Sequence, residues 1–397
     1  MKKRSGVRGT GLRGSLQPRP TVEPEPDHAG GGNCVTHQQK AASGRLFHFE
    51  GIIMRQLLAT IFLSLALCAP ALAANATELT VMTHDSFAMS KDVLSRFEAD
   101  SGITVRIMQS GDAGAALNQA ILAKNSPLAD VFYGVDNTFL SRALKAGIFE
   151  PYAPAGIEAV PAELRLDAES RLVPVDFGDV CLNYDPAWFA AKGITPPAAL
   201  EDLARPEYKD LLAVQNPATS SPGLAFLLAT IGHFGEEEAF TFWKRLKDNG
   251  VLVTGGWKDA YWGHFTAASK GKRPIVVSYA TSPAAEVHFG KDPQAPAPTA
   301  AVLAPGSAFR QVEFAGILKG SKNPEAARKF MDFLLSPAFQ EDIPLQMFVF
   351  PANAQAKLPE VFVKHARQAE IPALVAPEAI DARREAWIAR WTQLMVN

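Results

Sequence analysis

Most of the chain alternates short β-rich runs with amphipathic helical stretches, and this alternation constrains its fold more than any other feature. The run 79–82 predicts a strand. Val93 and Phe97 then recur at helical spacing, and 103–107 alternates apolar and polar residues as a half-buried strand does. Strands that alternate with helices form parallel βαβ units. The sequence therefore predicts an α/β fold.

A second block of the same alternation begins after 172–175, which favours two domains for a chain of 397 residues. A last predicted helix places Trp387, Trp391 and Leu394 on one face, and this stripe predicts packing against the body of the protein. The other elements predicted after 175 are strands at 180–184, 275–279 and 312–318, helices at 223–233 and 236–249, a helix capped by Asn323, and a loop at 292–298.

The first 73 residues do not follow this pattern. Segment 1–53 is basic and rich in proline and glycine, with no apolar period, so we expect it to be disordered if it is translated at all. Residues 54–73 combine a short basic start, an apolar run and a small-x-small end, which predicts a secretory signal peptide. The apolar run is shorter than the about 20 residues of a membrane-spanning helix. We therefore expect Met54 to be the true start, and Leu67 before Cys68 favours a free product over a lipoprotein.

Charge and cysteine content narrow the class of protein further. The net charge of −2 gives no argument for nucleic-acid binding. Without the basic segment 1–73 the chain becomes more acidic, which suits a cationic ligand. Only Cys181 remains after cleavage, so no internal disulfide is expected. The chain shows no internal repeat, no metal-ligand spacing and no phosphate-binding glycine loop, so no cofactor is predicted.

A series of short segments is distributed in a fixed order along the chain. In this order and spacing the series resembles the periplasmic thiamine-binding proteins of bacterial ABC importers, and the resemblance covers about 78–397. The segment 330–340 is shared with iron- and polyamine-type binding proteins, whereas 254–261 and 277–284 are more specific. The full series is 83–87, 134–137, 173–178, 183–185, 215–223, 254–261, 277–284 and 330–340.

The resemblance implies a two-domain periplasmic binding protein of type II-like architecture, with a hinge and a central ligand cleft. The chain would cross between the domains near Val175 and return near Phe309. The implied boundaries are 74–175 plus 310–397 for domain 1 and 176–309 for domain 2.

The resemblance also implies a set of ligand-binding residues. His84 stands where the family has a tyrosine, and Phe348 stands where it has a tryptophan. The implied set is His84, Asp112, Ala113, Ser220, Ser221, Trp257, Tyr279, Ala280, Thr281, Ser282 and Phe348.

The chemistry of these side chains fits a cation with a flat ring. Aromatic faces such as Trp257 attract a thiazolium charge, and Asp112 pairs with a cation or accepts from an amino group. Ser220 and Ser221 precede a predicted helix, whose N-terminus favours a phosphate. Simpler interpretations stay open at this point, because Asp112 also suits a helix cap, Trp257 the core and His84 a surface position.

The implied function is that of a solute-binding subunit that captures thiamine or its phosphates in the periplasm. It would act as a monomer without catalysis and deliver its ligand to a permease, while ATPase subunits supply the energy. A polyamine or ferric iron is an alternative ligand, although Tyr279-Ala280 lacks the paired tyrosines of iron sites. A thiamine-degrading transferase with Cys181 as nucleophile is the enzymatic alternative.

Overall fold

The computed structural model describes residues 77–292 and 295–396, and these residues lie in one compact unit. The predictions of a disordered 1–53 and a signal peptide at 54–73 concern residues outside this range. Within the described part of the chain, no helix has the length and apolar character needed to cross a membrane.

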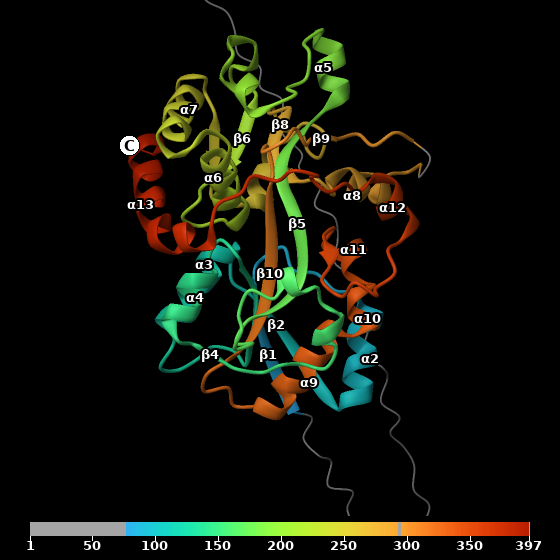
Figure 1. Ribbon diagram of the computed structural model, residues 1–397. Helices are drawn as coiled ribbons and strands as arrows, with labels where there is room; N and C mark the ends of the chain where they lie inside the picture. Colours follow the sequence, from blue (N-terminus) through green and yellow to red (C-terminus); the bar gives the residue numbers. More distant parts are fainter. Residues whose placement is uncertain (1–76, 293–294, 397) are drawn as a thin grey trace, which may run out of the picture. The chain divides into compact units, whose positions relative to one another are not determined.

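The described strands form one mixed sheet in which β1 pairs in parallel with β2 and β3, while β10 and β5 run antiparallel to their neighbours in its middle. This arrangement confirms the predicted α/β class (Figure 1). The order is β2-β1-β3-β10-β5-β8-β6-β7, with β4, β9 and β11 off this path. The bounds are β1 Thr77–Thr83, β2 Ile103–Gln109, β3 Val131–Asp136, β4 Phe149–Glu150, β5 Val173–Tyr184, β6 Leu212–Gln215, β7 Leu252–Thr254, β8 Ile275–Tyr279, β9 Ala300–Val302, β10 Phe309–Leu318 and β11 Phe350–Pro351.

The two long strands β5 and β10 connect two groups of elements that we call the first lobe (β1 to β4 with α2, α3, α4 and α9) and the second lobe (β6 to β9 with α5 to α8). Residues 173–180 of β5 pair with β10, and its last five residues pair with β8 of the second lobe. Figure 1 shows both strands running from one group to the other. The helices are α2 Lys91–Ser101, α3 Ala113–Leu122, α4 Leu140–Ala146, α5 Pro186–Lys192, α6 Ser221–Phe234, α7 Glu236–Asp248, α8 Ser282–Phe289, α9 Pro324–Leu335, α10 Pro337–Gln340, α11 Ile343–Gln346, α12 Glu360–His365 and α13 Pro377–Met395.

The C-terminal helices contact the second lobe. Helix α13 packs on α7 and α12 packs on α8. Trp391 is fully buried and meets Trp243 edge-on at a ring distance of 5.4 Å, so the predicted aromatic stripe packs against the body as expected. The sequence-based boundaries grouped 310–397 with the first lobe, whereas these two helices lie against elements of 176–309. The boundaries themselves stay a prediction.

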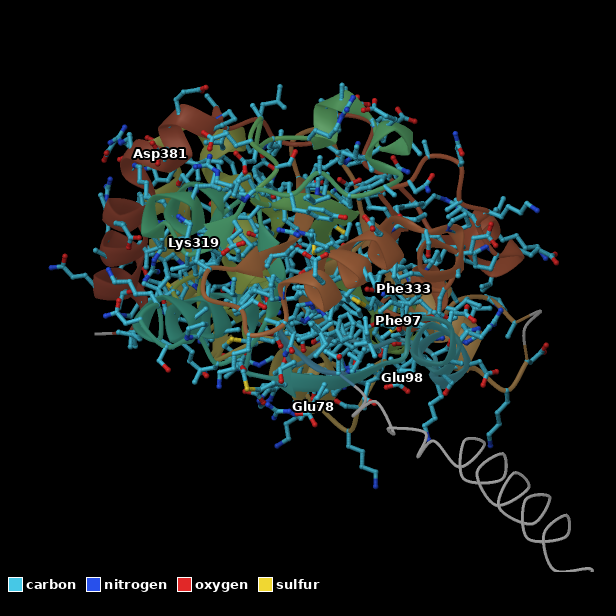
Figure 2. The ribbon with its side chains drawn as sticks, turned by 90° about the horizontal axis from the view of Figure 1, so that it is seen from below. Glu78, Phe97, Glu98, Lys319, Phe333 and Asp381 are labelled. Atoms are coloured by element: carbon cyan, nitrogen blue, oxygen red, sulfur yellow. The ribbon has the colours of Figure 1, made fainter. Side chains whose placement is uncertain are left out.

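Aromatic packing holds the helices of the first lobe on its sheet. Phe97 of α2 and Phe333 of α9 lie side by side with ring centroids 4.6 Å apart (Figure 2). Phe97 also meets the buried Phe330 edge-on at 5.5 Å. These contacts join α2 to α9.

Candidate functional site

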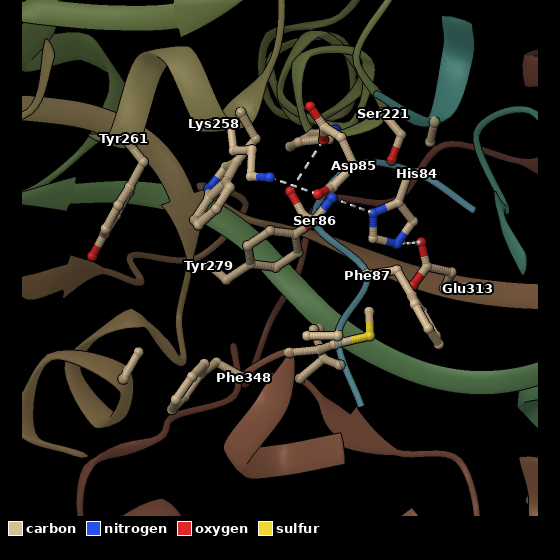
Figure 3. Close-up of a pocket in the computed structure, with 18 of the residues that line it drawn as sticks. His84, Asp85, Ser86, Phe87, Ser221, Lys258, Tyr261, Tyr279, Glu313 and Phe348 are labelled. Atoms are coloured by element: carbon tan, nitrogen blue, oxygen red, sulfur yellow. Dashed lines mark hydrogen bonds and ion pairs between the residues drawn. The ribbon is translucent and has the colours of Figure 1, made fainter. Parts of the chain in front are cut away.

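A cavity of about 330 Å³ lies where the two lobes meet beside β5 and β10. This is within the size range of small-molecule sites. The first lobe contributes the loop after β1, the second lobe contributes the start of α8, and the crossing strands supply residues between them (Figure 3). Nine of the predicted site residues line this cavity, namely His84, Asp112, Ala113, Ser221, Trp257, Tyr279, Thr281, Ser282 and Phe348.

Two predicted residues lie behind the cavity wall. Ser220 is fully buried and donates a hydrogen bond from its hydroxyl to Asp112 Oδ2 at 3.0 Å. Ala280 is also fully buried, in a small apolar cluster with Cys181, Ala308 and Ala369. Neither side chain is in the lining, so any contribution to binding is through the residues that they support.

Asp112 joins the two lobes. It is the N-cap of α3, where its Oδ1 accepts from the N–H of Ala113 at 2.8 Å. Its carboxylate also accepts from the N–H of Ser221 at 3.1 Å and from the N–H of Trp257 at 3.0 Å. Burial raises the pKa of this carboxyl, and the hydrogen bonds from Trp257, Ser221 and Ser220 act in the opposite direction. The N-terminus of α6, predicted to hold a phosphate, is thus occupied by this carboxylate.

A second polar contact crosses between the same lobes. Lys258 Nζ donates to the backbone carbonyl of Asp85 at 2.7 Å, as the dashed line in Figure 3 shows. Lys258 and Asp85 both line the cavity, and neither was among the predicted site residues. The loop after β1 is therefore tied to the segment that carries Trp257.

The aromatic wall is more extensive than the sequence indicated. Trp257 stacks on Tyr261 at a ring distance of 4.9 Å and an interplanar angle of 18°, and Trp262 meets both rings edge-on. The Trp257 indole N–H donates to the Ser278 hydroxyl at 2.9 Å, which fixes the ring. Trp262 and Phe289 also line the cavity but are 46% and 65% exposed, so they form its rim.

Phe348 is held on the opposite side in an unusual backbone conformation. Its φ is +55°, in the left-handed region that bulky residues rarely adopt. Its carbonyl accepts a short hydrogen bond from the Thr281 hydroxyl, which joins two predicted site residues directly. Such strained positions persist where the surrounding structure enforces them and are common at ligand sites.

His84 is buried at the cavity floor rather than at the surface. Its Nδ1 accepts from the N–H of Ser86 at 3.2 Å, and its Nε2 lies 3.2 Å from Glu313 Oε1 (Figure 3). Burial lowers the pKa of His84, but Glu313, Asp112 and Asp85 together raise it above its ordinary value of 6.5. Protonation would nevertheless break the bond from Ser86, because Nδ1 would then carry a hydrogen.

Two acidic lining residues on the crossing strands were missed by the sequence analysis. Asp176 lies in β5 and Glu313 in β10, and both line the cavity. Tyr133 donates a short hydrogen bond from its hydroxyl to Asp176. Burial and the neighbouring Glu313 raise the pKa of Asp176 well above its usual range. Glu313 lies inside the predicted strand 312–318, and an acidic residue in that apolar run was an available signal, whereas no strand was predicted at Asp176.

The enzymatic and metal alternatives find little support in the geometry. Cys181 is buried in β5 and does not line the cavity, and burial followed by the charge of Asp179 raises the pKa of its thiol. Among the described residues, no group of three or more His, Cys, Asp and Glu side chains is placed to hold a metal ion.

Comparison with known proteins finds relatives that are named for thiamine binding. The family model described as "Bacterial extracellular solute-binding protein" matches residues 126–368. The chain is 35% identical over 322 residues to the thiamine-binding periplasmic protein of Escherichia coli K12, covering 79% of this chain and 92% of that one. It is 33% identical over 333 residues to the protein of that name from Brucella suis, covering 81% and 93%. A solved structure titled "Periplasmic thiamin binding protein" matches with a TM-score of 0.72 at 32% identity, covering 80% of this chain and 96% of that chain.

Proposed function

The chain belongs to the bacterial extracellular solute-binding protein family, and from this premise we propose that it is the thiamine receptor of an ABC importer. The observation that carries the proposal is the cavity at the meeting of the two lobes, with aromatic faces on its walls and carboxyl groups on its floor. A flat cation binds well where aromatic faces contact its ring and carboxyl groups lie near its charge. Its relatives named for thiamine binding cover nearly all of the described residues.

Aromatic rings supply the binding face for the thiazolium cation. A cation over a tryptophan or tyrosine face gains about 0.5–2 kcal/mol, depending on its desolvation. Trp257, locked by Tyr261 and Ser278, is already oriented, so little conformational entropy is lost when the ligand arrives. Tyr279 is fixed in the same way, because its hydroxyl donates to Gln311 Oε1 at 2.7 Å.

We propose that the protein prefers thiamine to thiamine phosphates. The helix N-terminus expected to bind a phosphate already holds the Asp112 carboxylate. The described lining contains one lysine, Lys258, whose ammonium group is bonded to Asp85. Thiamine diphosphate would need to displace that contact.

Ligand capture closes the lobes around the cavity, and the closed form is delivered to a membrane permease driven by ATPase subunits. We place the protein in the periplasm as a monomer, exported by the predicted signal at 54–73, and without catalytic activity. Among residues 77–292 and 295–396, the buried Cys181 is the one thiol, and it is not part of the cavity lining.

Isothermal titration of the purified protein tests the proposal. Thiamine, thiamine monophosphate, thiamine diphosphate, spermidine and ferric citrate are titrated in parallel. We expect thiamine to bind with a Kd of about 1 μM or below, and at least about tenfold more tightly than spermidine. Absence of heat with thiamine, or tighter binding of spermidine or ferric citrate, would refute it.

A further inference from the structure

Glu313 and Asp176 face each other across the two strands that join the lobes. The pairing of β10 with β5 places these two residues directly opposite, and the pairing of β10 with β3 places Glu313 opposite Asp136. Like charges in directly opposed positions destabilise a sheet. This acidic row at the crossing point can therefore persist only where its members are protonated or lie beside a compensating group.

The backbone around Glu313 is shaped to aim its side chain. The register of β10 shifts against β5 between Glu313 and Phe314, and it shifts against β3 just after Phe314. Gly134 lies at the second irregularity with φ +115°, and a Cβ there would lie 2.6 Å from the His84 ring. Bulges are frequent beside functional sites because they redirect a side chain. Here they make room for His84 and Glu313 to meet at the cavity floor.

Among the described residues, the charge of Glu313 at this floor has only a titratable partner, His84. Asp176 is buried and bonded to Tyr133, in surroundings that favour its protonated form. Among the described residues, Glu313 forms its ion pair with His84, and no lysine or arginine is paired with it. A nearly buried carboxylate without a permanent cation beside it is energetically unfavourable unless something else compensates it.

The adjoining imidazole is also incompletely satisfied. The side chain of His84 is 10% exposed, and Nε2, although 3.2 Å from Glu313, is not aligned for a hydrogen bond with any group in the described residues. Buried polar atoms almost always have a partner. His84 Nε2 thus stays free to meet a polar group of a ligand at the cavity floor.

We propose that Glu313 is the specificity-determining carboxylate of the cavity, selecting a cationic ring over a neutral ring of the same shape. Asp176 holds it in place from β5, and His84 offers the ligand a second polar contact. The inference rests on the proposed function, because it identifies the group that distinguishes a charged form of the same ligand from a neutral one. Aromatic walls alone also bind neutral rings, whereas a buried carboxylate makes the charge of the ligand decisive.

Two ligands of matched shape test this selection. One is thiamine, and the other is its neutral thiophene analogue, in which carbon replaces the charged ring nitrogen. We expect the wild-type protein to bind thiamine at least about 30-fold more tightly than the analogue. In Glu313→Gln we expect the Kd for thiamine to rise by at least about 30-fold while the Kd for the analogue changes by less than about threefold.

Glu158→Gln is the matched control, because it removes the same charge from a side chain that is 88% exposed and outside the cavity lining. Its thiamine affinity should equal that of the wild type, and circular dichroism should show that both variants fold. If the wild-type protein binds thiamine and the analogue with equal affinity, the inference is overturned. It is also overturned if folded Glu313→Gln prefers thiamine over the analogue as strongly as the wild type does. A wild-type protein that binds neither ligand would instead refute the proposed function.

Discussion

The carboxylate of Asp112 in the first lobe accepts a hydrogen bond from the backbone N–H of Trp257 in the second lobe, at 3.0 Å. The same carboxylate caps α3 and receives the first N–H of α6. The Asp112 side chain thus links α3 of the first lobe to α6 and to Trp257 in the second lobe. The position predicted to touch the cation therefore also links the two lobes.

Asp112→Ala should favour the open form. The N–H groups of Ser221 and Trp257 would lose their acceptor, and an unsatisfied buried donor costs about 1–3 kcal/mol. In an open form water satisfies them, so the closed form becomes less populated. We expect a weaker thiamine affinity by at least about tenfold, and a larger radius of gyration by small-angle X-ray scattering at equal thiamine concentration. An unchanged radius and Kd would show that Asp112 is only the cap of α3.

Trp257→Ala should weaken thiamine binding through loss of the cation–π face. The expected loss of about 0.5–2 kcal/mol corresponds to about 2–30-fold in Kd. Trp188→Ala is the matched control, because Trp188 lies in the second lobe outside the cavity lining. Quenching of tryptophan fluorescence by thiamine in wild type, together with calorimetric Kd values, measures the effect. Equal affinity in Trp257→Ala and wild type would remove Trp257 from the site.

Thiamine affinity should fall as the medium becomes acidic. A bound cation disfavours protonated His84, so affinity is full above the pKa of His84 and declines as pH falls through it. Because this pKa is raised from 6.5, the decline should begin above pH 6.5. The titratable groups facing His84 and its partner are Glu313, Asp112, Asp85, Tyr133 and Asp176.

His84→Gln isolates this effect, since glutamine keeps a polar contact but takes up no proton. The ligand's own titration is the same for both proteins and cancels in their ratio of Kd values. If protonation of His84 causes the loss of affinity, the ratio of the two Kd values should change with pH above 6.5. A constant ratio between pH about 5 and 8 would assign the dependence to other groups.

The Cys181 thiol should be unreactive in the folded protein. Its burial raises its pKa, and a protonated, inaccessible thiol is a poor nucleophile. We expect slow alkylation by iodoacetamide in native conditions and rapid alkylation in urea, and intact thiamine after incubation with a competing base. Turnover of thiamine that is lost in Cys181→Ser would instead establish the transferase alternative.

Trp391→Ala should destabilise the fold without changing the site. Trp391 is fully buried against Trp243, and no residue of α13 lines the cavity. Removing such a side chain costs about 3–5 kcal/mol of unfolding free energy. Urea denaturation should show this loss, while calorimetry on the folded variant should give a wild-type Kd for thiamine. A change in affinity would indicate that α13 shapes the cavity.

Local sequence patterns predicted several of the strands and helices, and the family resemblance predicted much of the lining. Strand and helix periods near 79–82 and Phe97 depend on neighbours in sequence, and the structure has β1 and α2 there. Trp257, Tyr279 and Phe348 were found through the family resemblance and do line one cavity. Ser220 and Ala280 were placed beside the ligand by the same resemblance, yet both are covered by their neighbours, because adjacent positions in a chain need not face the same side.

The sequence by itself determined the α/β class, the family and the chemical types of side chain available for a flat cation, because these follow from local periodicity and from motifs of fixed spacing. Only the tertiary structure decided that Asp112 spans the lobes and that Asp176 meets Glu313 beside His84. Residues 176 and 313 are far apart in the chain, and the register of β5 against β10 alone brings them together. The physical reason is that strand pairing, burial and the resulting pKa values depend on contacts between distant segments, which no local pattern encodes.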